Sequence, residues 1–404
     1  MYLTHLSLTN FRAFSRLDMD LPRRILLLVG DNAQGKTTLL EAIYFLATFT
    51  SIHAAPDRQM INFLAGDGPL AVARMVADYV RGGQNHRMEV RLIQESNGTN
   101  GSRYRKEILI DGVKRSVQDA MGNFNAVVFM PQMTRYIEGG PDERRRYLNL
   151  TLAQVSPGYA QALTDYSQAL SQRNALLKQL SERGGDAEQL IYWDKLISQR
   201  GAVLIYARGA AIQELDLLAG RLHQRLTEGR EVLQLVYRPA YDPALSGDAQ
   251  YALPIETAVD RSRFSVEDIQ QGFLKQLQVV RREEIARGVT TIGPHRDELR
   301  FTANGIDLGE YGSRGQIRTT LLALKLAEVD WMKGKTGHWP VLLLDETLAE
   351  LDLNRRAYLL RALETCEQGL LTTTDLDMFT PDFVQQSTVW NVRAGQVDSI
   401  DPAI

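Results

Sequence analysis

The chain has 404 residues, of which 44% are hydrophobic and 24% charged, with a formal net charge of -3. This composition is typical of a globular protein with two or three domains. One cysteine, Cys366, excludes a disulfide framework and a cysteine-rich zinc site, and it fits a reducing cytoplasm. We expect a cytoplasmic protein without a membrane segment, because the apolar runs fall far short of about 18 residues.

The first informative segment predicts a strand, a phosphate-binding loop and a helix. Ile25–Val29 is a continuous apolar run, and Lys36–Thr48 has the apolar spacing of a helix. Between them lies the pattern G-x-x-x-x-G-K-T, which binds phosphates through backbone N–H groups and a lysine. The Thr37 hydroxyl is expected to ligate Mg²⁺. The residues expected to hold ATP are Gly30, Asp31, Asn32, Ala33, Gln34, Gly35, Lys36, Thr37 and Thr38.

The next hundred residues predict an antiparallel sheet beside the main one. Residues 72–77 and 88–93 alternate as strands do, and Asp111-Gly112 after residues 108–110 predicts a tight hairpin. Basic residues flank this hairpin and could contact DNA phosphates, although ordinary solvated charge is the alternative. They are Arg103, Arg105, Lys106, Lys114 and Arg115.

The middle of the chain predicts a mainly helical insertion over residues 140–288. It would separate two parts of one ATPase head, residues 1–139 and 289–404. Ser156-Pro157 is typical of a helix start, and Ser265 with Asp268 predicts another helix that ends at Gly288. Residues 232–237 predict a strand within the insertion. A second basic cluster at a helix start is a further DNA candidate: Arg144, Arg145 and Arg146.

A second helix start with glycine predicts another anion site. Residues 319–332 form an apolar helix pattern, and Ser313 precedes it as a candidate N-cap. Gly315 permits the close approach of an anion, and Gln316 belongs to the same motif. Because one nucleotide needs one phosphate loop, this start is expected to contact the nucleotide of another subunit. A plain capped core helix is the alternative.

An acidic pair ends the last strongly apolar run. Residues 341–344 are aliphatic, and Asp345 and Glu346 follow directly. Asp345 is expected to hold Mg²⁺, and Glu346 to polarise the attacking water as catalytic base. Asp352, slightly further along, could face a neighbouring subunit. A strand-end turn with solvated acids is the alternative for this pair.

Together these motifs resemble the RecF family, which belongs with the SMC/Rad50-like branch of the ABC ATPases. Further matching blocks are 6–14, 129–132, 140–148, 172–178, 293–297 and 315–319. The resemblance implies that Arg12 lies near the nucleotide and that Gln132 senses the γ-phosphate or Mg²⁺. No histidine follows the acidic pair; Thr372, Thr373 and Thr374 occupy the expected switch position.

The resemblance also implies an architecture and an activity. The expected fold is α/β: an ABC/SMC-like ATPase head, with a mixed sheet and an antiparallel subdomain, carrying the helical insertion. The expected activity is slow hydrolysis of ATP with Mg²⁺ by a homodimer that closes on ATP. Expected partners are double-stranded DNA, single/double-strand junctions, RecR with RecO, and indirectly RecA.

Two other functions share these motifs. An ABC transporter subunit would place them closer together, whereas here Lys36 and Ser313 are 277 positions apart (313 − 36 = 277). An ATPase of an anti-phage or nuclease system would usually carry a further catalytic domain.

Overall fold

The computed structural model describes residues 1–53, 56–65, 70–96, 102–244, 261 and 263–400. Contacts divide the chain into two compact units. The first unit comprises residues 1–133 and 325–404, and the second comprises residues 134–324. None of the described helices combines the length and apolar character that crossing a bilayer requires.

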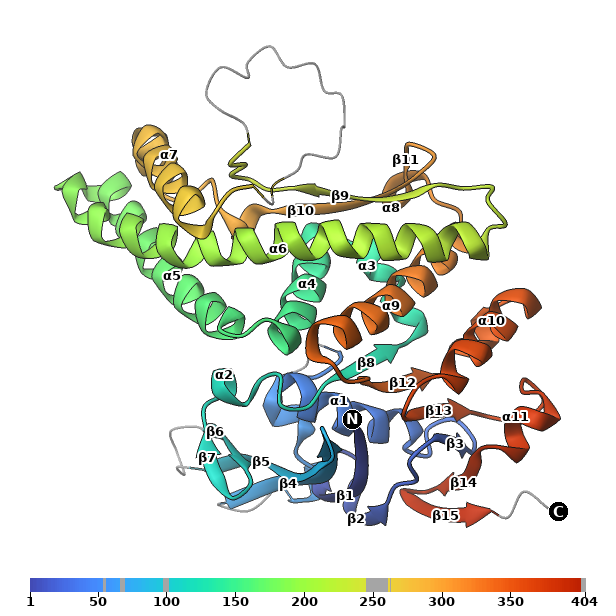
Figure 1. Cartoon of the computed structure of the whole chain (residues 1–404). Helices are drawn as coiled ribbons and strands as arrows, with labels where there is room; N and C mark the ends of the chain where they lie inside the picture. The colour runs from blue at the N-terminus through green and yellow to red at the C-terminus, as the bar shows by residue number, and fades with distance from the viewer. Residues whose placement is uncertain (54–55, 66–69, 97–101, 245–260, 262, 401–404) are drawn as a thin grey trace. The chain divides into compact units, whose positions relative to one another are not determined.

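The first unit contains a mainly parallel sheet with the strand order β15-β14-β3-β13-β12-β8 (Figure 1). The four pairings from β14 to β8 are parallel, and β15 pairs antiparallel with β14. The central strands are short aliphatic runs buried on both faces, as expected for parallel sheets. Their bounds are β3 Ile25–Val29, β8 Ala126–Phe129, β12 Val341–Asp345, β13 Gly369–Thr373, β14 Thr388–Arg393 and β15 Gln396–Ile400.

A second, antiparallel sheet of the same unit has the order β2-β1-β4-β5-β6-β7. Its strands are β1 Tyr2–Phe11, β2 Phe14–Asp20, β4 Leu70–Arg81, β5 Gln84–Ser96, β6 Ser102–Ile110 and β7 Val113–Arg115. This confirms the predicted antiparallel subdomain and its hairpin, in which Ile110 pairs with Val113.

Helix α1 (Lys36–Thr48) packs against strands of both sheets of the first unit. Because it is covered on both sides, it is apolar around most of its circumference, and it is buried from Leu39 to Thr48. The remaining helices of this unit are α2 Val117–Ala120, α10 Leu353–Glu364 and α11 Pro381–Gln385, together with the C-terminal part of α9. The short 3-10 turns η1 (Asp57–Met60), η2 (Phe63–Ala65), η4 (Pro131–Thr134) and η8 (Thr347–Glu350) lie in its loops.

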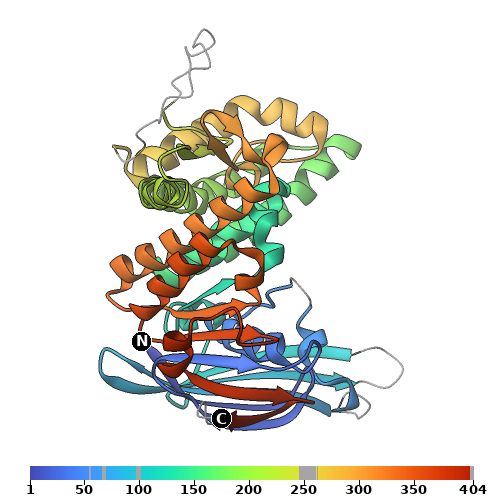
Figure 2. The same ribbon diagram turned by 90° about the vertical axis from the view of Figure 1, so that its right-hand side faces the viewer.

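The second unit is built on α6 (Leu190–Leu226), against which α5 (Tyr159–Arg183) and α7 (Val266–Arg287) pack. Figure 2 looks nearly along the axis of α6. The unit also contains α3 Arg135–Glu138, α4 Pro141–Val155, α8 Leu308–Tyr311 and the first part of α9 (Arg314–Thr336). The predicted capping box of Ser265 and Asp268 is present at the start of α7.

Three sequence-based boundaries differ from the structure, because the insertion predicted over residues 140–288 corresponds to a unit over residues 134–324 and one helix begins later than predicted. The second unit extends to Leu324 because β10 (Glu298–Ala303) pairs with β9 (Leu233–Arg238) and β11 (Ile306–Asp307) in one antiparallel sheet. This long-range pairing keeps residues 298–307 with the helices rather than with the head. The helix predicted to begin at Ser156-Pro157 begins at Tyr159, after Gly158 in a left-handed conformation with φ +77°.

Candidate active site

The phosphate-loop residues join the end of β3 to the start of α1. A Cβ added to Gly30 would lie 2.3 Å from the carbonyl oxygen of Val392, so this position requires glycine. Gly35 has a φ of +109° and packs on the Phe14 ring. Ala33, which also has a positive φ of +64°, is exposed together with Asp31 and Asn32. The loop therefore presents backbone at its outer surface, as phosphate binding requires.

Hydrogen bonds made by the side chains of Gln34 and Lys36 hold this loop in place. The side-chain carbonyl of Gln34 accepts a hydrogen bond of 2.7 Å from the N–H of Ala394, which follows β14. At the other end, Nζ of Lys36 donates to the carbonyl oxygens of Gly30 and Asp31, the latter at 3.1 Å. The Lys36 side chain is 5% exposed. Its ammonium group is thus held inside the curl of the loop, where an anion would be bound.

Thr37 and Asp345 meet at the carboxyl end of the parallel strands. The Thr37 hydroxyl lies 2.9 Å from Oδ1 and 3.0 Å from Oδ2 of Asp345. Burial raises the pKa of Asp345, and its hydrogen bonds with Thr372 and Thr37 oppose the rise. A hydroxyl and a carboxylate are the hard oxygen donors that Mg²⁺ prefers. These two residues therefore fit the ligand set predicted for Mg²⁺.

Glu346 follows β12 in a left-handed conformation with φ +47°. Its Oε1 lies 3.5 Å from Nζ of Lys36, and its side chain is 43% exposed. The carboxylate is consequently close to the phosphate loop while remaining accessible to water, which suits a catalytic base. Its backbone N–H donates a 3.0 Å hydrogen bond to the hydroxyl of Thr372.

Gln132 lies at the same edge of the sheet. It follows β8, and β8 pairs in parallel with β12 so that Phe129 is opposite Leu344. Since parallel strands end at a common edge, Gln132 and Asp345 both follow strand ends there. The hydroxyl of Thr347 also donates to the carbonyl oxygen of Phe129 at 3.1 Å, which ties the two strand ends together.

Arg12 lies in the turn between β1 and β2, with φ +52°. Its guanidinium makes two hydrogen bonds to the carboxylate of Glu41 on α1, at 2.9 and 3.1 Å. The hydroxyl of Ser51 donates to the same carboxylate at 2.7 Å. The Glu41 side chain is 4% exposed, so this ion pair fixes Arg12 against the helix that begins at the phosphate loop.

The predicted second anion site belongs to the second unit. Ser313 and Gln316 form reciprocal hydrogen bonds, from the Gln316 N–H to Oγ of Ser313 (3.2 Å) and from the Ser313 N–H to Oε1 of Gln316 (2.9 Å). The side chain of Gln316 also donates to Glu231 at 2.9 Å. A Cβ added to Gly315 meets no atom within 4 Å, so the space beside this helix start is open.

Three comparisons with known proteins bear on this geometry. The family model described as RecF/RecN/SMC N terminal domain matches residues 2–395. A protein of Roseiflexus castenholzii, named DNA replication and repair protein RecF, is 40% identical over 409 residues, covering 98% of this chain and 99% of that protein. The chain belongs to the RecF family.

Solved structures of RecF agree with this assignment. One, described as the recombination mediator protein RecF-ATPrS in the RecFOR pathway, has a TM-score of 0.82 and 27% identity. Another, described as RecF-ATP in the same pathway, has a TM-score of 0.80 and 27% identity. Each comparison covers 99% of this chain and 98% of the other. The α/β, ABC/SMC-like fold predicted for this RecF-family chain is thereby confirmed.

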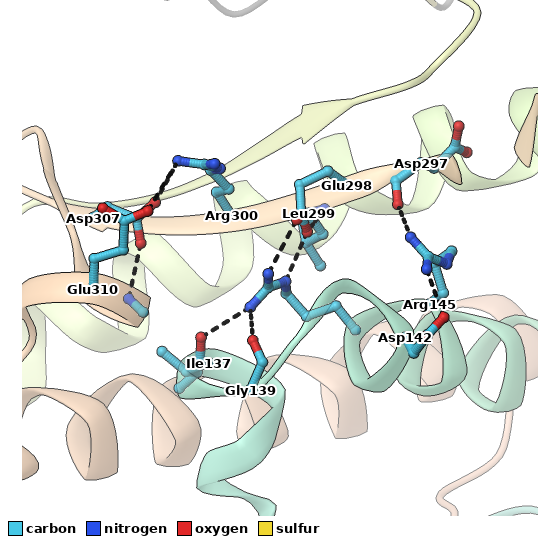
Figure 3. A network of polar contacts seen from close by, with 12 residues as sticks. Ile137, Gly139, Asp142, Arg145, Asp297, Glu298, Leu299, Arg300, Asp307 and Glu310 are labelled. Atoms are coloured by element: carbon cyan, nitrogen blue, oxygen red, sulfur yellow. Dashed lines mark hydrogen bonds and ion pairs between the residues drawn. The ribbon is translucent and has the colours of Figure 1, made fainter. Parts of the chain in front are cut away.

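Two of the predicted DNA-contacting residues of this RecF-family chain have partners within the second unit. Arg144, on α4, makes two hydrogen bonds of 2.7 and 3.1 Å to Glu298 and also donates to the carbonyl oxygens of Ile137 and Gly139. Figure 3 shows where the partner residues Ile137, Gly139 and Glu298 lie. Arg145 binds Asp142 and the carbonyl oxygen of Asp297. Their side chains are 11% and 18% exposed. Arg146 also has a polar or electrostatic partner. These contacts give Arg144 and Arg145 a structural role, and their contact with DNA stays a prediction.

The basic residues that flank the predicted hairpin fall into two groups, one with structural partners and one without an ion pair among the described residues. Lys106 is 16% exposed and binds Asp57 and the carbonyl oxygen of Phe49. Arg105 and Lys114 form ion pairs with carboxylates of their own sheet. Arg103 and Arg115 are exposed, and no ion pair reaches either of them from the part of the chain that is described. These two remain the best candidates for phosphate contact.

Sequence reasoning missed two contributors to the site. It did not identify Glu41, and it placed Thr372 at the strand end without a partner. The signal for Thr372 was available, because parallel pairing of β12 with β13 puts Thr372 opposite Asp345. Asp352 also has a local role, since its side chain accepts from the N–H of Arg355 at the start of α10 and pairs with the Arg355 guanidinium.

Proposed function

We propose that this chain is an ATP-dependent DNA-binding protein that forms a homodimer on ATP and hydrolyses it slowly. The single observation that supports this best is the cluster of Lys36, Thr37, Asp345 and Glu346 around the phosphate loop. The printed descriptions of the solved relatives, RecF-ATPrS and RecF-ATP, support ATP as the ligand.

In this proposal, each residue of the site has a separate task. The loop amides and Lys36 bind the β- and γ-phosphates, and Thr37 with Asp345 would hold Mg²⁺. Bound Mg²⁺ would neutralise charge that develops on the phosphate oxygens. Glu346 accepts a proton from the attacking water, and Gln132 lies beyond β8 as the sensor of the γ-phosphate or Mg²⁺.

Dimerisation would bring in the second helix start. Ser313, Gly315, Gln316 and Asp352 of one protomer would face the nucleotide of its partner, and the N-terminus of α9 would favour the phosphate charge. ATP would then stabilise the paired state because it contacts both chains only there. The local hydrogen bonds of Ser313 and Gln316 are compatible with this role, since they leave other backbone N–H groups of the first turn available.

The biological role that fits the family is recombinational gap repair in the cytoplasm. The closed dimer would bind double-stranded DNA or a single/double-strand junction through basic side chains, without reading sequence. It would act with RecR and RecO, in line with the RecFOR pathway that the descriptions of the relatives name. The promotion of RecA loading follows from the resemblance to the family. Family membership favours this role over a transporter subunit or an anti-phage nuclease ATPase.

The decisive experiment measures the mass of the protein by light scattering, with and without ATP and then with junction DNA. The wild type should change from monomer to dimer on ATP. Lys36→Ala should stay monomeric, whereas Lys275→Ala, which changes an exposed lysine of α7, should behave as the wild type. Dimerisation of Lys36→Ala with ATP would contradict the switch.

A second variant tests where the partner's nucleotide is contacted. Ser313→Arg should bind ATP as a monomer but fail to pair, because the arginine occupies the open space beside Gly315. Ser171→Arg on the exposed surface of α5 is the matched control. Loss of ATP binding together with pairing in Ser313→Arg would show that this helix start serves its own chain.

A further inference from the structure

Thr372 is a buried threonine near the end of β13, 4% exposed, and it lies beside the acidic pair. The parallel register of β12 and β13 places it opposite Asp345. A hydroxyl at this position can both donate and accept a hydrogen bond. Thr372 uses both capacities, and both of its partners belong to the acidic pair.

The donated hydrogen bond runs from the Thr372 hydroxyl to Oδ1 of Asp345, at 2.7 Å. Together with the contact from Thr37, it gives the Asp345 carboxylate two hydroxyl donors. A carboxylate held by two fixed hydroxyls has little freedom to rotate. Thr372 therefore sets the orientation of the carboxylate that the site offers to a cation.

The accepted hydrogen bond comes from the backbone N–H of Glu346, at 3.0 Å. Glu346 has a φ of +47°, a conformation that residues with a Cβ adopt mainly where surrounding contacts hold it. This backbone conformation determines where the Glu346 side chain points, and its carboxylate reaches to within 3.5 Å of Lys36. The Thr372 oxygen is thus one of the contacts that hold the catalytic-base candidate in its direction.

We propose that Thr372 is a positioning residue for hydrolysis, acting on Asp345 and Glu346 through one hydroxyl group. The inference rests on the proposed ATPase function, and it assigns Thr372 a role that needs no contact with the nucleotide. Removing the hydroxyl leaves the Glu346 N–H and an oxygen of Asp345 each without one partner. Glu346 then turns away from its productive direction, while the phosphate loop, which receives no described hydrogen bond from the Thr372 side chain, still binds ATP.

The test compares Thr372→Val, which has the same shape without the hydroxyl, with Thr372→Ser, which keeps it. Thr302→Val, at a buried threonine in β10 of the second unit, controls for the same substitution in a strand. In the absence of nucleotide, hydrogen exchange of the peptide covering residues 345–351 is followed by mass spectrometry. The Glu346 amide should exchange about tenfold faster in Thr372→Val and within about twofold of wild type in the other two variants.

Steady-state hydrolysis gives the second measurement. Thr372→Val should lower kcat by about 10- to 100-fold with KM changed less than about threefold, and Thr372→Ser should recover most of kcat. Unchanged exchange and unchanged kcat in Thr372→Val would overturn the proposal, as would equal losses in Thr372→Ser. If the wild type shows no turnover, the proposed ATPase function fails, and the exchange measurement still decides whether Thr372 holds Glu346.

Discussion

Thr37 lies 2.9 and 3.0 Å from the two carboxylate oxygens of Asp345, although 308 positions separate these residues in the sequence. This contact joins the start of α1 to the end of β12. It assembles the two halves of the expected Mg²⁺ site within one unit, because both residues lie at the carboxyl edge of the parallel sheet.

Glu346→Gln should abolish hydrolysis while leaving ATP binding in place. The amide keeps the size of the side chain but cannot accept a proton, so turnover should fall by about 10²-fold or more. Single-turnover assays and light scattering should then show a long-lived ATP dimer. Glu364→Gln, an exposed glutamate at the end of α10, provides the control. Turnover at the wild-type rate would remove Glu346 from the mechanism.

Arg12 and Glu41 should behave as one functional unit. Arg12→Ala removes the guanidinium, and Glu41→Gln removes the charge that fixes it. Each change should raise the Kd for a fluorescent ATP analogue by about 3- to 20-fold, and the double variant should be no weaker than the more affected single variant. Additive losses in this cycle would mean that Glu41 acts separately from Arg12.

Neutralising Arg103 and Arg115 should weaken DNA binding without affecting ATP binding. Removing two phosphate contacts should lower the magnitude of the slope of log K against log salt by about 2. Fluorescence anisotropy with duplex DNA measures this slope. The pair Arg183→Gln and Arg221→Gln, exposed arginines of α5 and α6, removes the same charge from the second unit. An equal change in both double variants would indicate a general charge effect rather than a site.

His295 should make the protein less stable as the pH falls below neutral. Its Nε2 lies 3.2 Å from the carbonyl oxygen of Thr290, so Nε2 carries the proton, and Nδ1 accepts a 2.7 Å hydrogen bond from Tyr166. Burial is the main cause that lowers the pKa of His295, from 6.5 to about 4. The unfolded chain therefore binds a proton at a higher pH than the folded chain does, and stability present above pH 6.5 is lost as the pH approaches 4.

Urea unfolding measures this loss. The linkage relation gives about 2 kcal/mol between pH 8 and pH 5 for this histidine. His295→Gln, which does not titrate, should reduce the pH dependence by that amount. His53→Gln, at an exposed histidine with no resolved hydrogen bond to its ring among the described residues, is the matched control. A pH profile of His295→Gln parallel to that of the wild type would show that another group titrates.

Much of the fold was predictable because its signals are local. The loop at residues 30–38, the capping box of Ser265 and Asp268, and the hairpin at Asp111 each depend on neighbours within a few residues. The register between strands is not a local signal, since it depends on segments that lie far apart in the chain. For that reason the end of the second unit at Leu324 and the partners of Arg144 were not predictable from charge or pattern.

Local sequence patterns were enough to predict the chemistry that the chain can offer: a phosphate loop with Lys36 and Thr37, and an acidic pair at a strand end. Tertiary structure decided which side chains surround that chemistry. It placed Thr372 between Asp345 and Glu346, fixed Arg12 on Glu41, and used Arg144 to hold a turn to β10. The physical reason is that hydrogen bonds and ion pairs require atoms within about 3 Å, and only packing of distant segments creates such proximity.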